Sequence, residues 1–125
     1  MKRGIVLFAH GSRDPEWGEP VQRLAGIVAN RDTDASVVTA FLEHLQPPLE
    51  QAVAALAERG VAEITVVPVF IAQGGHLKQD LPRIVAAIRE THPALSIKLA
   101  PAMGESGAVL EAMADFVSRA SRGAQ

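Results

Sequence analysis

The sequence predicts a single α/β domain in which a parallel sheet lies between layers of helices, and three observations lead to this prediction. The chain has 125 residues, too few for two independent units of the usual ~100 to 150 residues. Short β-branched runs alternate with segments of helical spacing. These runs are apolar almost throughout, which is typical of strands covered on both faces. We therefore expect one three-layer α/β/α domain over residues 1–125.

Four runs predict the strands, at residues 5–9, 37–42, 64–71 and 96–100. Each run is rich in β-branched and apolar side chains, and a helical segment follows each one. Regular alternation of strand and helix favours a parallel sheet with right-handed crossovers.

The first two helices have recognisable ends. The first is predicted to begin at Asp14 and Pro15, because Asp caps helices and Pro suits the first helical position. The second is predicted to begin at Pro47 and Pro48 and to end at Gly60, a favourable residue just past a helix C-terminus. Their apolar faces comprise Val21, Leu24, Ala25 and Val28 in the first, and Leu49, Val53, Leu56 and Ala57 in the second.

The third helix is predicted to begin near Asp80, with Pro82 tolerated in its first turn, and to end before His92. The fourth is predicted from about Ser106. Its apolar face comprises Val109, Leu110, Met113 and Val117. Such faces are expected to pack against a sheet.

Composition excludes several classes of function. The chain has no cysteine, so disulfides, thiolate nucleophiles and sulfur-based metal sites are excluded. A net charge of −2, scattered basic residues and 4% aromatic content disfavour nucleic-acid binding. No run approaches the ~20 apolar residues of a membrane helix, and the first apolar run is too short for a signal peptide. We expect a cytoplasmic protein that binds neither nucleic acid nor membrane.

Candidate metal ligands follow three of the predicted strands, at the carboxyl edge where open parallel sheets bind ligands. His10 follows the first strand, Glu43 the second and His76 the third. Two imidazoles and a carboxylate suit borderline divalent ions such as Co²⁺, Fe²⁺, Ni²⁺ or Zn²⁺ and leave positions open for exchange. Two of these residues also have an alternative interpretation that involves no metal. His10 is then a packed histidine bonded to backbone, and Glu43 is a solvated surface residue.

Glycines and cations flank these candidates. Gly75 precedes His76 in a Gly-Gly pair that relaxes the backbone, but the spacing and the Lys-Ser/Thr ending of a phosphate loop are absent. Arg13 and Lys78 are positioned to bind an acidic ligand, unless they are simply solvated cations.

Three further residues are predicted to be structural. If the second strand continues, His44 points away from Glu43. His92 lies at a helix C-terminus, where an imidazolium suits the dipole. Trp17 is expected to serve packing or an interface.

The chain resembles the small CbiX-type sirohydrochlorin chelatases, single-domain relatives of the two-domain class II chelatases. The segments that carry the resemblance cover nearly the whole chain in order: His10-Gly-Ser-Arg-Asp-Pro, Ala40-Phe-Leu-Glu, Val67-Pro-Val-Phe, Gly75-His76 and Asp80-Leu-Pro82. The resemblance implies a sheet of order 2-1-3-4 and a metal held by His10 and His76 with Glu43 nearby.

The resemblance also implies an activity. It predicts insertion of a divalent metal, Co²⁺ by preference or Fe²⁺, with Ni²⁺ also open, into sirohydrochlorin during cobalamin or sirohaem biosynthesis. The metal is then a substrate, and no organic cofactor is expected. Ser12, Arg13, Gly75 and Lys78 form the predicted tetrapyrrole-binding set. Which base accepts the pyrrole protons stays open between Glu43 and a histidine.

The two-domain relatives form their cleft between similar halves, so the resemblance implies a homodimer with the tetrapyrrole between subunits. Two alternatives stay open. One is a metallochaperone that carries the ion without catalysis, and the other is a half-site completed by a different chain.

Overall fold

The computed structural model describes residues 2–72 and 74–123, apart from the side chain of His76. Its strands are β1 (Arg3–Ala9), β2 (Ala35–Phe41), β3 (Glu63–Pro68) and β4 (Ser96–Leu99). Its α-helices are α1 (Glu19–Arg31), α2 (Leu49–Glu58), α3 (Gly75–Thr91) and α4 (Gly107–Ser121), joined by two short 3₁₀ helices, η1 (Pro15–Gly18) and η2 (Met103–Glu105). Strand and helix alternate along the chain, as predicted.

The four strands form one parallel sheet of order β2-β1-β3-β4, which confirms the predicted order. β3 ends at Pro68 rather than at residue 71. The apolar run continues past the ladder, where the Val69 N–H still donates to the Phe8 carbonyl at 2.7 Å.

One face of the sheet is closed by α2 and α3. Between these helices and the strands lies the larger core, in which Val6, Phe8, Leu56, Ile64 and Leu81 are fully buried. Each such side chain contributes roughly 1.5 to 3 kcal/mol relative to exposure. This face therefore provides most of the hydrophobic stabilisation.

The opposite face is only partly covered. Helix α1 packs over β1 and β2, where Leu7, Val21 and Phe41 are buried. No helix in the described part of the chain makes an extended contact with β3 and β4 on this side. We call this region the open half-face; it comprises Glu63, Thr65, Val67, Ser96 and Lys98.

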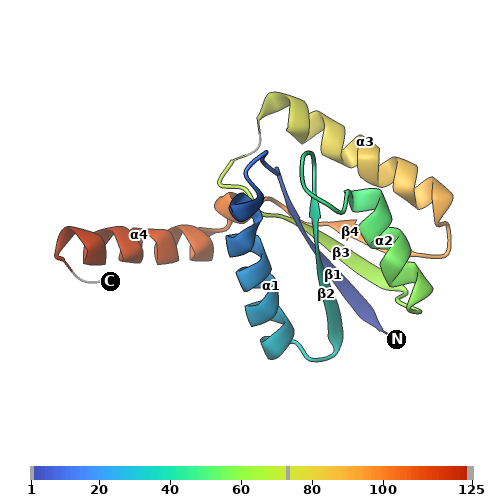
Figure 1. Cartoon of the computed structure of the whole chain (residues 1–125), viewed down its shortest axis with the longest axis horizontal. Coiled ribbons are helices and arrows are strands. Elements are labelled where there is room, and N and C mark those ends of the chain that lie inside the picture. Colours follow the sequence, from blue (N-terminus) through green and yellow to red (C-terminus); the bar gives the residue numbers. More distant parts are fainter. Residues whose placement is uncertain (1, 73, 124–125) are drawn as a thin grey trace.

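Helix α4 projects away from the domain (Figure 1). Its extended contacts are with η2, and none of its residues is buried. The expectation of helices on both faces is thus met by α1, α2 and α3. The fourth predicted helix exists, with Ser106 as its N-cap, but in the described part of the chain it makes no extended contact with the sheet.

Two helix starts differ from the prediction. Asp14 does act as a cap, but of η1: its Oδ1 accepts the Glu16 N–H at 3.0 Å, and α1 begins afterwards. Helix α3 begins at Gly75, not near Asp80, so Pro82 lies inside it. Leu77 packs on the same core as buried Leu81, and this spacing of four residues extends the helix toward its N-terminus.

No helix in the described ranges combines the length and apolar character that crossing a bilayer requires.

Candidate metal-handling site

His10 and Glu43 meet at the carboxyl edge of the sheet. His10 directly follows β1, and Glu43 lies just beyond β2, the neighbouring strand. The His10 Nε2 lies 3.3 Å from the Glu43 Oε1, and both side chains are about half exposed, at 53% and 51%. The two predicted ligands thus lie within direct contact and are open to an incoming ion.

The backbone holds the two loops together. Beyond the last strand residues, the Leu42 N–H donates to the Ala9 carbonyl at 3.0 Å and the Glu43 N–H to the His10 carbonyl at 3.1 Å. Gly11 has φ +100°, and a Cβ there would lie 1.8 Å from the Glu43 carbonyl oxygen. Only glycine fits this close approach. Gly11 therefore allows the two loops to touch and sets the position of the imidazole relative to the carboxylate.

The spacing of the pair matches what one divalent ion requires. Bonds of about 2.1 Å at tetrahedral angles place ligand atoms about 3.4 Å apart, close to the 3.3 Å observed. In the part of the chain that the structure describes, no group of three or more His, Asp or Glu side chains is arranged around one point. The pair would therefore need a further protein ligand or solvent to complete a coordination shell.

His44 does not point away from Glu43, contrary to the orientation predicted for a continuing strand. Its Nε2 lies 3.8 Å from the same Glu43 oxygen that faces His10. The prediction assumed strand alternation, but β2 ends at Phe41, and His44 adopts a left-handed conformation with φ +68°. A loop backbone of this kind turns the imidazole back toward the carboxylate. The signal in the sequence was a His adjacent to Glu43.

Phe70 is a site residue that the sequence reasoning did not single out. Its ring makes edge contacts with Phe8, at a centroid distance of 6.2 Å, and with His10, at 6.4 Å. It therefore links the His10 ring to the closed core and restricts its movement. The only signal was its place at the end of Val67-Pro-Val-Phe.

The third predicted ligand lies on the first turn of α3. Helix α3 follows β3, which neighbours β1, so its start is at the carboxyl edge as predicted. The His76 ring lies outside the described part of the structure. Gly75 opens the helix, and its N-cap residue Gly74 offers no side chain to cap it; uncapped N–H groups in a first helical turn favour an anion. Lys78 is exposed on the same turn.

Ser12 and Arg13 lie in the loop after His10. The Ser12 Oγ accepts the Asp14 N–H at 3.1 Å, which leaves the hydroxyl hydrogen available to donate. Arg13 is exposed, and no ion pair involves it within residues 2–72 and 74–123. Ser12 is partly exposed, and both residues lie within three positions of His10 in the chain.

Trp17 and His92 make contacts other than with His10 and Glu43 in the described part of the structure. Trp17 packs edge-on against Phe41 at a centroid distance of 6.5 Å and is 40% exposed. His92 follows α3, where its N–H donates to the Ile88 carbonyl at 2.9 Å. The structural roles expected for both residues stay predictions.

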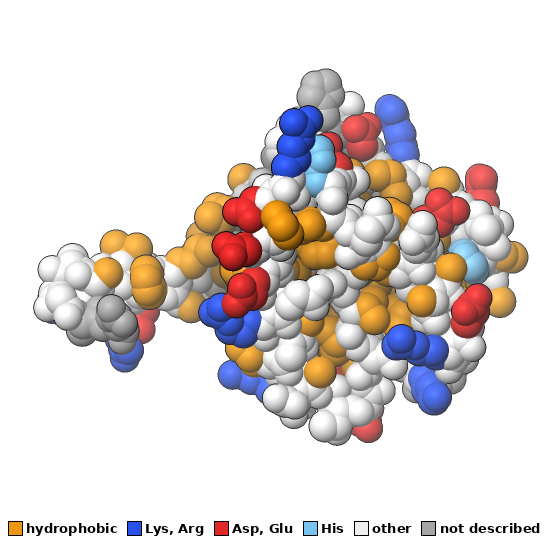
Figure 2. All heavy atoms as spheres, viewed as in Figure 1, with side chains coloured by type: hydrophobic (Ala, Val, Ile, Leu, Met, Phe, Trp, Pro, Cys, Tyr) orange, Lys and Arg blue, Asp and Glu red, His pale blue; other side chains and the backbone are white. Residues whose placement is uncertain are grey.

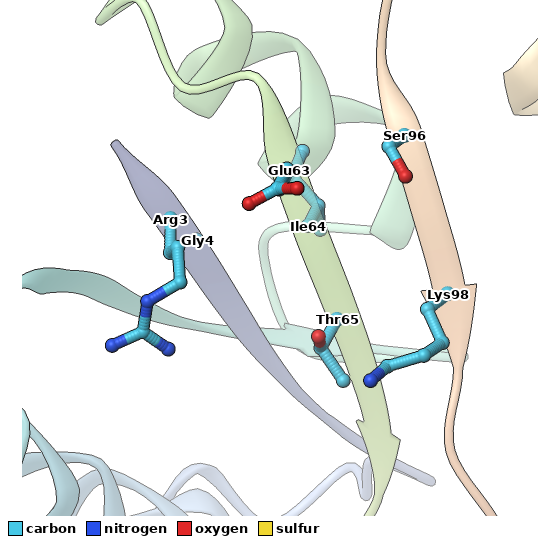
Figure 3. A pocket seen from close by; sticks show the side chains of 7 residues that line it. All are labelled: Arg3, Gly4, Glu63, Ile64, Thr65, Ser96 and Lys98. Atoms are coloured by element: carbon cyan, nitrogen blue, oxygen red, sulfur yellow. The ribbon is translucent and has the colours of Figure 1, made fainter. Parts of the chain in front are cut away.

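A hollow of about 250 Å³ lies at the opposite, amino edge of the sheet (Figure 3). Its lining comprises Arg3, Gly4, Glu63, Ile64, Thr65, Ser96 and Lys98. Arg3 donates to the Asp32 carboxylate at 2.6 Å, and this hydrogen bond raises the pKa of the guanidinium. The hollow has no imidazole and lies where parallel sheets do not usually bind ligands. We therefore place the candidate site at the carboxyl edge.

Known proteins share this sequence and fold. The profile of the CbiX family matches residues 4–120. A sirohydrochlorin cobaltochelatase of Methanosarcina acetivorans is 40% identical over 85 residues, which are 68% of this chain and 65% of that protein. The match thus spans just under two thirds of that relative's length.

Two solved structures are also similar. A putative cobalamin biosynthesis CbiX protein of Marinobacter aquaeolei VT8 is 31% identical, with a TM-score of 0.86 over 98% of this chain and 99% of that one. The sirohydrochlorin chelatase SirB of Bacillus subtilis subspecies spizizenii, in complex with cobalt, is 25% identical, with a TM-score of 0.78 over 94% of this chain and 50% of that one. With a family profile matching nearly its whole length, the chain belongs to the CbiX family.

Proposed function

We propose that the protein is a sirohydrochlorin chelatase that inserts a divalent metal, Co²⁺ by preference or Fe²⁺, into the tetrapyrrole. The observation that carries this proposal is the 3.3 Å contact between His10 and Glu43 at the carboxyl edge. Support comes from the names of the relatives, a sirohydrochlorin cobaltochelatase and a chelatase in complex with cobalt.

The first task of the site is to hold the ion without trapping it. A neutral imidazole and a carboxylate bind first-row dications through N and O, and water fills the remaining positions. We assign His10 and Glu43 to this task, with His76 as the third ligand. Because the pair is half exposed, water and the macrocycle can exchange at the bound ion.

The second task is to accept the two pyrrole protons. A base must lie within hydrogen-bonding reach of the proton it removes. Glu43 and the histidines beside it are the bases at this edge, and the ion itself lowers the proton affinity of nearby groups. His44, at 3.8 Å from the Glu43 carboxylate, extends the set of candidates.

The third task is to bind an acidic macrocycle. We assign this to Arg13 and Lys78 as cations, to Ser12 as a hydroxyl donor, and to Gly75 through the N–H groups at the start of α3. Guanidinium groups and helix N-termini both favour carboxylates. The exposure of Arg13 and Lys78 supports this assignment.

We further propose that two copies form the cleft. Half of the SirB chain corresponds to nearly all of this one. A pair of chains related by a twofold axis would restore the two halves around one tetrapyrrole.

The test is turnover. Sirohydrochlorin mixed with excess Co²⁺ or Fe²⁺ and a trace of protein should change its visible absorption far beyond one equivalent per chain. A metal carrier would bind the ion and leave the rate of insertion at the protein-free value, which would contradict the proposal. Rates compared for Co²⁺, Fe²⁺ and Ni²⁺ would identify the preferred metal.

A further inference from the structure

His44 adopts a backbone conformation that costs free energy. Its φ is +68°, and in the part of the chain that the structure describes no other residue except glycine has a positive φ. The Leu45 N–H donates to the Glu43 carbonyl at 2.8 Å, which closes a three-residue turn around His44. This form of γ-turn is rare and strained. Such strain persists only where the surrounding structure fixes it, and it clusters at functional sites.

The contacts of both neighbouring residues impose this turn. On one side, the Glu43 N–H donates to the His10 carbonyl at 3.1 Å, and a Cβ on Gly11 would lie 1.8 Å from the Glu43 carbonyl oxygen. On the other side, Leu45 packs on the core under α1. The backbone of His44 therefore lies between two anchored residues, and its strain is maintained rather than released.

The strained turn directs the imidazole of His44 toward the carboxylate of Glu43. The His44 Nε2 lies 3.8 Å from the Glu43 Oε1, and the His44 side chain is 35% exposed, less than the 53% of His10. Figure 2 shows histidine and carboxylate side chains at the surface of the upper end of the molecule, toward which the strands run. In an extended backbone, consecutive side chains point to opposite sides. The left-handed conformation of His44 is therefore what brings the two groups together.

The Glu43 carboxylate needs a partner of this kind if it is to bind a metal. Carboxylates that ligate a metal are themselves hydrogen-bonded, which orients them toward the ion. Among the described residues, no group donates a hydrogen bond to this carboxylate, and the basic side chains that contact it are His10 and His44. Because His10 is assigned to the ion, His44 is left to orient the carboxylate.

We infer that His44 is a positioning residue, which donates its Nε2–H to the Glu43 carboxylate and orients one carboxylate oxygen toward an ion shared with His10. The inference rests on the proposed function and deepens it. A side-chain movement of about 1 Å gives a hydrogen bond of ordinary length, and hydrogen bonds at such sites often tighten once the ligand is bound. In the described ranges, no three metal-binding side chains surround one point, so His44 acts through Glu43 and not as a ligand of the same ion.

The first experiment is a titration of the protein with Co²⁺ in the absence of tetrapyrrole, followed by calorimetry and by the visible absorption of the bound ion. His44→Gly should raise the Kd for Co²⁺ by roughly tenfold or more, as is typical when the partner of a metal ligand is lost, and should change the absorption spectrum. Its midpoint of urea unfolding should not fall, because glycine adopts the φ of +68° without strain. An unchanged Kd for Co²⁺ would overturn the inference.

Two further variants test whether the lost hydrogen-bond donor causes the effect. His44→Gln supplies an amide N–H in place of the imidazole N–H and should recover most of the affinity for Co²⁺. His92→Ala removes an imidazole that follows α3 and should keep the wild-type Kd. If His44→Gln binds Co²⁺ as weakly as His44→Gly, or if His92→Ala binds it equally weakly, the contact with Glu43 is not the cause and the inference fails.

The second experiment measures metal insertion and separates this role from the proposed function. His44→Gly should raise the KM for Co²⁺ and leave kcat nearly unchanged, as expected when binding of the ion alone is weakened. A fall in kcat with an unchanged Kd for Co²⁺ would instead assign His44 to proton transfer and overturn the positioning role. A wild type that binds Co²⁺ without inserting it would refute the chelatase proposal, whereas the Co²⁺ titrations would still decide the role of His44.

Discussion

The carboxyl and amino edges of the sheet both carry charged side chains, but they use them differently. At the carboxyl edge, an imidazole and a carboxylate from two loops lie 3.3 Å apart, and the loop backbones are hydrogen-bonded to each other. At the amino edge, Arg3 is engaged with Asp32, and the remaining side chains line a shallow hollow. The comparison teaches that charge alone does not distinguish the two edges: among the described residues, the carboxyl edge differs in bringing an imidazole and a carboxylate together on two loops that are hydrogen-bonded to each other.

The largest effect should come from His10→Ala. Loss of one imidazole from the pair should reduce the rate of metal insertion by about a hundredfold or more, whereas the free energy of unfolding should change little, because the side chain is 53% exposed. Insertion rates and urea unfolding curves measure the two quantities. The control His92→Ala removes an imidazole far from the site and should keep the rate. Near-normal insertion by His10→Ala would contradict the assignment of metal insertion to the carboxyl edge.

Gly11→Ala should come next. The new Cβ would collide with the Glu43 carbonyl, and φ +100° is unfavourable for alanine, so we expect a destabilisation of about 3 kcal/mol together with a slower insertion rate. Gly26→Ala is the matched control, because it lies in α1 with no atom near the added carbon. That change should stabilise the protein by about 0.5 to 1 kcal/mol. Equal stability of the two variants in denaturant titrations would mean that the loops are not locked together.

A smaller effect is expected from Arg13→Ala. If the guanidinium binds a substrate carboxylate, the KM for sirohydrochlorin should rise by roughly tenfold, with kcat nearly unchanged. Steady-state kinetics at fixed metal concentration would separate the two parameters. A fall in kcat alone would assign Arg13 a different role.

The smallest effect is predicted at the amino edge. Glu63→Gln removes a charge from the hollow of about 250 Å³, and the insertion rate should stay within about twofold of the wild type, as is usual for exposed residues outside a site. The same assay as for His10→Ala measures it. A loss of insertion rate comparable with that of His10→Ala would indicate that the functional site lies at the amino edge instead.

Much of the fold could be predicted from the sequence because local signals and tertiary packing agree. The apolar runs that predict the strands become β1 to β4, and Gly60, with φ +84°, follows α2 as expected. The start of α3 could not be found from capping signals, since the packing of Leu77 on the core outweighs the Asp80-Leu-Pro82 pattern. The stripe on α4 predicts a face packed on the sheet, but the helix makes its extended contacts with η2 and none of its residues is buried.

The site was predictable where it depends on topology. Adjacent parallel strands bring their carboxyl ends together, so His10 and Glu43 were expected to be neighbours, and they are. The position of His44 depends on one left-handed residue, which strand alternation cannot anticipate. The contact of Phe70 with His10 likewise depends on the path of a loop beyond the last strand residue.

The fit of Gly11 against the Glu43 carbonyl has a consequence for metal selectivity. Because two hydrogen bonds and the close Gly11 contact join the loops, the backbones that carry His10 and Glu43 are positioned before any ion arrives, which lowers the entropy cost of binding one. A preorganised pair of this span accepts small first-row dications, whereas Ca²⁺ prefers longer bonds of 2.3 to 2.6 Å and more oxygen ligands. Under the proposed function, discrimination against the abundant hard cations therefore begins with a single missing side chain.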